Sequence, residues 1–192
     1  MKKSMMNKAA LVLLLASTAM SVHAKTVKPS LQAQVQSLKV ENAALKQTIK
    51  KFEDVQKVES RNLKQFDDLD YIGWTGKDIK VFEASHDENV HVEGMMSAEN
   101  LVQHSGDAKK YYPMLQNGDG VTAHPIKIAQ DDWTAVVGAT QSTATDAATG
   151  KSKVTKGFML TLAKWANGKI TEEYLFKLNG DADKSWMNKY VK

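Results

Sequence analysis

The last sixty residues constrain the fold more than any other part of the chain. They divide into four long strand-like segments separated by turn residues: 120–129, 133–145, 153–166 and 169–178. Asp131-Asp132 and residues 146–151 supply two of the turns, and Asn167-Gly168 is the dipeptide typical of a type I′ hairpin. Four such segments in succession predict an antiparallel meander.

Side-chain alternation along these segments leaves neither face of the sheet strongly polar. In the third segment Thr155, Met159, Thr161, Ala163 and Trp165 share a face. In the fourth, Ile170, Glu172, Tyr174, Phe176 and Leu178 share one, and Thr171, Glu173, Leu175 and Lys177 share the other. A sheet that is apolar on both sides needs cover on both. We expect helices on one face and a partner subunit on the other.

The first 24 residues have the pattern of an export signal. Three lysines precede a short apolar run at 9–16, and Val22-His23-Ala24 forms a small-residue cleavage site. Cleavage there predicts a periplasmic or secreted protein, and an uncleaved anchor is the alternative. This segment carries three of the net four positive charges. The remainder has no basic stripe that would bind nucleic acid, no second apolar run for a membrane and no cysteine.

Residues 25–58 predict a helical stalk. Leu31, Leu38, Leu45 and Phe52 recur every seven residues, and Val35, Asn42 and Ile49 fall between them. This is the seam of a short coiled coil with a polar residue at one core position, which favours a parallel homodimer. The alternative is a single amphipathic helix that packs on its own domain or frays.

From residue 59 the pattern becomes that of a globular domain, which we extend to 192. We expect a helix ending at Gly73, a helix capped by Thr75, a short strand at 90–93, and a helix over 97–115 interrupted at Ser105-Gly106. A final helix at 181–190 would present Trp186 and Tyr190 on one side. The glycine-rich turn at 117–120 lacks the strand-then-helix context of a phosphate loop.

Several short segments in this order resemble one known family. They are Trp74 with Gly76 and Asp78, the run His86–Val90, His124-Pro125-Ile126, Asp132–Gly138, the hairpin Asn167–Ile170 and the strand Glu172–Phe176. From Asn62 to Asn179 the chain resembles the SnoaL-like polyketide cyclase group of the nuclear transport factor 2-like superfamily. The resemblance implies an α+β cone, in which N-terminal helices pack on a strongly curved, mostly antiparallel sheet around a deep pocket.

The same resemblance implies frequent dimers through the outer face of the sheet. The family that the chain resembles includes cyclases and isomerases that use a buried Asp or His, as well as binding modules without catalysis. Several related proteins carry an Asp where this chain has Leu178, and its absence here argues against cyclase chemistry. Fold alone does not assign a function.

The candidate catalytic residues are His124, His91 and Glu172. A buried imidazole near a carboxylate can move a proton at neutral pH, and a half-buried Glu172 would suit general-acid chemistry. The structural alternatives are a histidine bonded to backbone, a surface His91 and a Glu172 paired with a lysine on the neighbouring strand. His86 is expected to end a helix rather than to catalyse.

Four aromatic side chains are candidates for the pocket wall: Trp74, Trp133, Tyr174 and Phe176. Core or rim packing is the alternative for the tryptophans. No metal is expected, because the histidines at 86, 91, 104 and 124 have no ligand spacing and no thiolate exists. No cofactor is expected either.

Three functions remain open. The first is an exported protein that binds a small hydrophobic molecule in the cone pocket. The second is a cofactor-independent cyclase or isomerase that uses a pocket histidine and a carboxylate. The third is an interaction protein whose stalk drives assembly.

Overall fold

A computed structural model describes residues 30–178 of the chain. Its elements are α2 (Leu31–Asp68), η1 (Leu69–Thr75), α3 (Ile79–Ser85), β1 (His86–Gly94), α4 (Leu101–Tyr111), η2 (Tyr112–Met114), β2 (Gly120–Gln130), β3 (Trp133–Thr145), β4 (Ser152–Ala166) and β5 (Lys169–Lys177). The predicted export signal and the predicted helix at 181–190 lie outside the described residues. None of the described helices is both long and apolar enough to cross a membrane.

The chain divides into two compact units within α2, the first ending at Gln47 and the second starting at Thr48. The described part of the first unit is helical, and Ser30 caps it by accepting a hydrogen bond from the Ala33 amide. The seam side chains Leu31, Leu38 and Leu45 are all exposed. Helix α2 continues through residue 58 without a break, so the stalk boundary at 58/59 stays a prediction.

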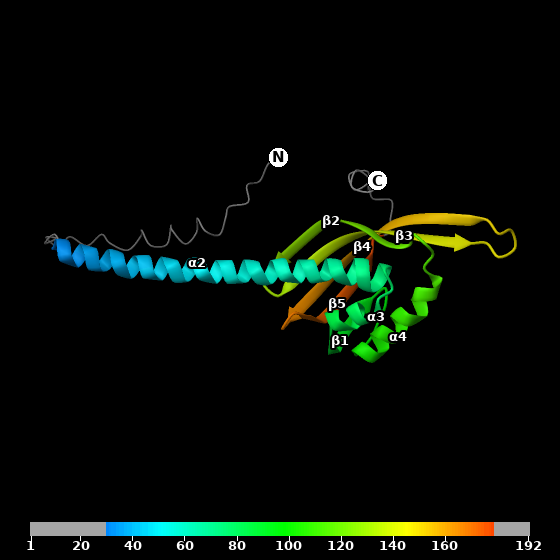
Figure 1. Ribbon diagram of the computed structural model, residues 1–192, viewed down its shortest axis with the longest axis horizontal. Helices are drawn as coiled ribbons and strands as arrows, with labels where there is room; N and C mark the ends of the chain where they lie inside the picture. The colour runs from blue at the N-terminus through cyan, green and yellow to red at the C-terminus, as the bar shows by residue number, and fades with distance from the viewer. Residues whose placement is uncertain (1–29, 179–192) are drawn as a thin grey trace. The chain divides into compact units, whose positions relative to one another are not determined.

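The second unit contains a five-stranded sheet in the order β1-β5-β4-β3-β2. Strand β1 pairs with β5 in parallel and the other pairs are antiparallel. The four predicted strands and the hairpin are confirmed: Asn167 and Gly168 have φ of 52° and 78°, as a type I′ turn requires. Figure 1 shows β3 and β4 bending as they run into their long hairpin.

The helices cover one face of this sheet. The larger of two apolar cores in the described residues joins Phe66 of α2, Phe82 of α3 and Ala108 of α4 to Trp165 of β4 and Ile170 of β5. The predicted face of β4 is confirmed, because Thr161, Ala163 and Trp165 are all buried on this side. We call the helix-covered side the inner face. The helices therefore cover one apolar face of the sheet, as the sequence predicted.

Strand β5 changes faces near its start. The pairing of β5 with both neighbours shifts between Ile170 and Glu172. Ile170 pairs with Trp165 on the inner face, and after the shift Glu173 pairs with Ala163, also on the inner face. An extra residue in one strand moves every following side chain to the opposite face. Our assignment of Glu172, Tyr174 and Phe176 to the face of Ile170 was therefore wrong.

The helical segments differ from prediction in their ends. The first helix does not stop at Gly73 but passes into the π-helical η1, which reaches Thr75. The cap of α3 is Asp78, whose carboxylate accepts from the Lys80 and Val81 amides, because Thr75 is engaged elsewhere by Val121. Asn100 caps α4, and that helix has no interruption at Gly106. Strand β1 is longer than expected and begins at His86.

Candidate functional site

A cavity of about 490 Å³ lies between the inner face of the sheet and the helices of the second unit. Its wall is mainly apolar, with contributions from Leu69, Trp74, Phe82, Leu115, Met159 and Leu175. Three buried residues with ionisable side chains also line the cavity: Asp70, His104 and Glu173. Apolar walls with a few converging polar groups are typical of sites for small molecules.

Glu173 is a carboxylate buried between two histidines. Its Oε2 lies 3.3 Å from Nε2 of His104 and 3.6 Å from Nε2 of His86. Burial raises the pKa of the Glu173 carboxyl, but its interactions with His104 and then His86 outweigh burial and lower that pKa to about 2. Glu173 is therefore an anion at the wall of an apolar cavity at neutral pH.

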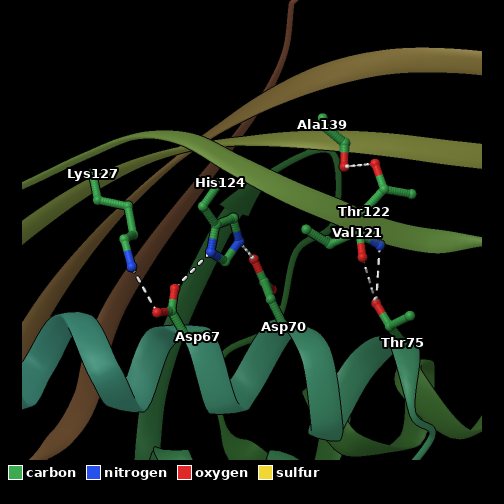
Figure 2. Close-up of polar contacts among 8 residues, drawn as sticks. All are labelled: Asp67, Asp70, Thr75, Val121, Thr122, His124, Lys127 and Ala139. Carbon is green, nitrogen blue, oxygen red and sulfur yellow. Dashed lines mark hydrogen bonds and ion pairs between the residues drawn. The ribbon is translucent and has the colours of Figure 1, made fainter. Parts of the chain in front are cut away.

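Asp70 is the second buried carboxylate of the cavity wall, and it lies on η1. Its Oδ2 is 2.8 Å from Nε2 of His124, which projects from β2 (Figure 2). Burial raises the pKa of Asp70, and contact with His124 only partly opposes this. A π-helical turn of this kind is often found at functional sites. Here it presents a carboxylate that takes up a proton more readily than an ordinary aspartate.

His124 is held between two carboxylates. Its Nδ1 lies 2.7 Å from Oδ1 of Asp67, and the other oxygen of Asp67 accepts a hydrogen bond from Lys127 at 2.6 Å (Figure 2). Burial lowers the pKa of His124, but Asp70 and then Asp67 outweigh burial and raise it. Both ring nitrogens face acceptors, so the imidazolium is the form that satisfies both.

The same cluster fixes the pKa of Asp67. Burial raises that pKa, but Lys127 and His124 outweigh burial and lower it. Lys127, Asp67, His124 and Asp70 thus form a chain of alternating charge from the surface to the cavity wall. The structural alternative for His124, a histidine bonded to backbone, does not describe this arrangement, because both ring nitrogens face carboxylates.

The other predicted catalytic residues lie away from the cavity wall. His91 is on the surface of β1, 2.9 Å from Glu93 and 3.2 Å from Glu99. Glu172 lies on the outer face, where it accepts hydrogen bonds from Lys164 at 2.7 Å and Tyr174 at 3.0 Å. The lysine-paired alternative for Glu172 describes its environment correctly.

Of the four aromatic pocket candidates, only Trp74 lines the cavity. Trp133 stacks on Tyr174 at 6.3 Å between ring centroids, on the outer face of the sheet. Phe176 is 45% exposed on the same face. The shift in β5 explains the error for Tyr174 and Phe176, because the side chains that reach the cavity are their neighbours Glu173 and Leu175.

Sequence reasoning missed Asp70, His86, His104 and Glu173 as a group. One signal is present in the sequence: Asp70 comes four residues after the apolar Phe66, a spacing that places the two side chains on the same face of a helix. His86 and His104 were considered too dispersed, but strand β1 and helix α4 bring their side chains against Glu173. Only the fold reveals that cluster.

The raised pKa of His124 predicts a measurable pH dependence. Nuclear magnetic resonance titration should show the His124 imidazole keeping its proton above about pH 6.5, the ordinary value. Stabilisation from that proton is fully present below about pH 6.5 and is lost as the pH rises through the raised pKa of the folded state. The free energy of unfolding should fall over that window in the wild type.

Substitution His124→Gln should reduce this fall and destabilise the protein by about 2–3 kcal/mol at pH 6, because it leaves a buried carboxylate without its partner. The control is His91→Gln, which removes an exposed imidazole and should leave the unfolding midpoint close to that of the wild type. A His124 that titrates at or below the ordinary value would contradict this electrostatic description.

No family model matches the chain, and no curated protein does. Solved structures do resemble it. IdmH from Streptomyces antibioticus, a candidate polyketide cyclase, has a TM-score of 0.52 at 13% identity, over 62% of this chain and 92% of its own. An LEH-like epoxide hydrolase of M. tuberculosis has a TM-score of 0.50 at 9% identity, over 69% of this chain and 94% of its own.

A SnoaL-like protein from Jannaschia sp. CCS1, also a candidate polyketide cyclase, has a TM-score of 0.49 at 17% identity, over 62% of this chain and 87% of its own. At such identities the likeness concerns the fold and carries no activity with it. The fold expected from the sequence is confirmed: the chain has an α+β, nuclear transport factor 2-like fold, which it shares with IdmH and the epoxide hydrolase.

Proposed function

We propose that the protein binds a small, mainly hydrophobic molecule in the cavity of its cone-shaped domain. The observation that carries this proposal is a cavity of about 490 Å³ with a mostly apolar wall and two buried carboxylates, Asp70 and Glu173. That volume suits a small organic ligand. The carboxylates favour a ligand whose apolar body carries a hydroxyl or another hydrogen-bond donor.

Gly157 offers a direct way to block the cavity. It lies on the inner face of β4 and lines the cavity, and a Cβ there would meet only the Thr140 hydroxyl, at 3.4 Å. Gly157→Phe should fill the space and abolish binding, whereas Gly157→Ala adds one methyl group and should retain it.

The measurement is the shift in melting temperature, with quenching of tryptophan fluorescence, across a panel of aromatic and polyketide-like compounds. A ligand present at 100 times its Kd stabilises the folded state by about 2.7 kcal/mol, which such a shift detects readily. Equal shifts for wild type and Gly157→Phe would place the binding elsewhere and end this proposal.

A second candidate function is a cofactor-independent cyclase or isomerase. The observation that favours it is that two buried carboxylates, Asp70 and Glu173, lie at one cavity wall and each has a histidine beside it. Their surroundings raise the pKa of Asp70 and lower that of Glu173 to about 2. Pairs of groups whose environments separate their pKa values are typical of acid–base catalysis. Asp70, backed by His124, is the better proton carrier, and it replaces Glu172 in that role.

Proton transfer is tested by incubating the compounds that bind in deuterated water and following deuterium uptake at carbon. Asp70→Asn should reduce the rate by about 10²–10⁴-fold, the usual contribution of general acid–base catalysis. Glu172→Gln, which alters the outer face, should leave it unchanged. An Asp70→Asn protein as fast as the wild type would leave binding as the only function.

The proposal includes export and a homodimer. Export predicts that the mature chain from the periplasm or medium begins at Lys25, which mass spectrometry of the intact protein tests directly.

The homodimer is supported by the exposed apolar seam of α2, where Leu38 is 64% and Leu45 62% exposed. An apolar stripe of this spacing is the surface that a coiled coil buries.

Light scattering of variants separates the two dimer surfaces. Leu38→Glu combined with Leu45→Glu should yield monomers if the seam holds the dimer, and Val40→Glu, exposed but off the seam, should not. Phe176→Glu should yield monomers if the outer face of the sheet holds it. A wild type that is monomeric at all concentrations would refute the dimer.

A further inference from the structure

Three buried side chains from distant parts of the chain converge at one end of the cavity. His86 begins β1, His104 lies in α4 and Glu173 lies in β5, and their exposed fractions are 0%, 2% and 5%. One potential ligand atom from each lies within 4.8 Å of the others. His104 and Glu173 line the cavity, whereas His86 is not part of its wall.

The tautomer of His86 is set by the backbone. Its Nδ1 lies 2.8 Å from the carbonyl oxygen of Phe82, and because a carbonyl only accepts, Nδ1 carries the proton. In the neutral ring Nε2 then has a free lone pair. That lone pair faces Oε2 of Glu173 at 3.6 Å, and a carboxylate anion is also an acceptor. Two acceptors at that distance need a positive charge between them.

His104 also has buried ring nitrogens that lack a hydrogen-bond partner in the described part of the chain. Neither of its ring nitrogens makes an aligned hydrogen bond to any of the residues 30–178 that the structure describes, although both are buried. Its Nε2 lies 3.3 Å from the Glu173 oxygen that His86 also approaches. Buried polar atoms without partners are rare, and a bound ion is one of the partners that can satisfy them.

The geometry points to a site for a divalent first-row transition metal ion such as Zn²⁺, held by His86, His104 and Glu173. Two imidazole nitrogens and one carboxylate are a common ligand set for zinc in sites that keep a fourth position open. Bonds of about 2.0–2.1 Å in a tetrahedron place neighbouring ligand atoms about 3.3 Å apart, close to two of the separations here.

The surroundings of the three ligands suit such an ion. The contact from Phe82 to Nδ1 of His86 is the second-shell bond that typically orients a metal-binding histidine. The fourth coordination position would face the cavity, because two of the three ligands line it. The site goes beyond the proposed function, since the cavity can bind an apolar molecule with or without a metal. The proposed metal site also differs from the expectation drawn from the sequence, in which the spacing of the histidines predicted no metal.

Zinc binding is tested on the untagged chain after treatment with a chelator. Calorimetric titration with zinc chloride should give one ion per chain, and zinc should raise the melting temperature whereas magnesium, which prefers oxygen ligands, should not. Glu173→Gln and His104→Gln should each weaken zinc binding more than about tenfold, since loss of even a second-shell partner costs 10–100-fold.

The control is His91→Gln. His91 stands beside Glu93 and Glu99 on the surface, so it is the other place where zinc would meet a histidine and carboxylates, and its loss should leave the affinity unchanged. Histidine nitrogen resonances of the wild type give a readout that needs no variant. Zinc should shift the Nε2 signals of His86 and His104.

The proposal is overturned if zinc does not bind, or if binding disappears in His91→Gln and persists in Glu173→Gln. It is also overturned if both Nε2 atoms remain protonated in excess zinc, since the cluster is then an ion pair of imidazolium and carboxylate. If the cavity variants fail to fold, the wild-type nitrogen signals decide the question. Apolar compounds should still bind the chelator-treated wild-type protein, in which every side chain of the cavity wall is kept, so the two proposals fail separately.

Discussion

The shift of register in β5 between Ile170 and Glu172 decides what the inner side of this protein contains. Before it, Ile170 packs in the apolar core; after it, Glu173 and Leu175 point inward, and Glu172 and Tyr174 face out. With uniform alternation Glu172, Tyr174 and Phe176 would point inward, and Glu173 would face out, away from His86 and His104. One extra residue in a strand therefore decides which glutamate of β5 lies beside the two buried histidines.

Because Glu173 and Asp70 are buried, the residues around them must supply hydrogen bonds or positive charge. Each of the two carboxylates has a histidine beside it. His124 is itself neutralised by Asp67, which pairs with Lys127 at the surface. That network joins η1 to β2, so the groups that set the electrostatics of the cavity also hold the helical cover to the sheet.

The sequence predicted the fold well because alternation and turn chemistry are local. All four C-terminal strands and the Asn167-Gly168 hairpin follow from period-two patterns and residues that accept positive φ. The site was predicted poorly for the opposite reason. A bulge has no clear signature in a run such as Thr171-Glu172-Glu173, so Glu172 was chosen over Glu173. The meeting of His86 with His104 depends on tertiary packing, which spacing along the chain does not encode.

The candidate site depends on which side chains of β5 point inward. Because the chain has no cysteine, single introduced cysteines can report this directly. Phe176→Cys and Leu175→Cys proteins should be reacted in the native state with a bulky maleimide, and the labelling rates compared with those in denaturant. We predict rapid labelling at 176, which is exposed, and strong protection at 175, which is buried. Protection at 176 with rapid labelling at 175 would mean uniform alternation from Ile170, and would contradict the site described above.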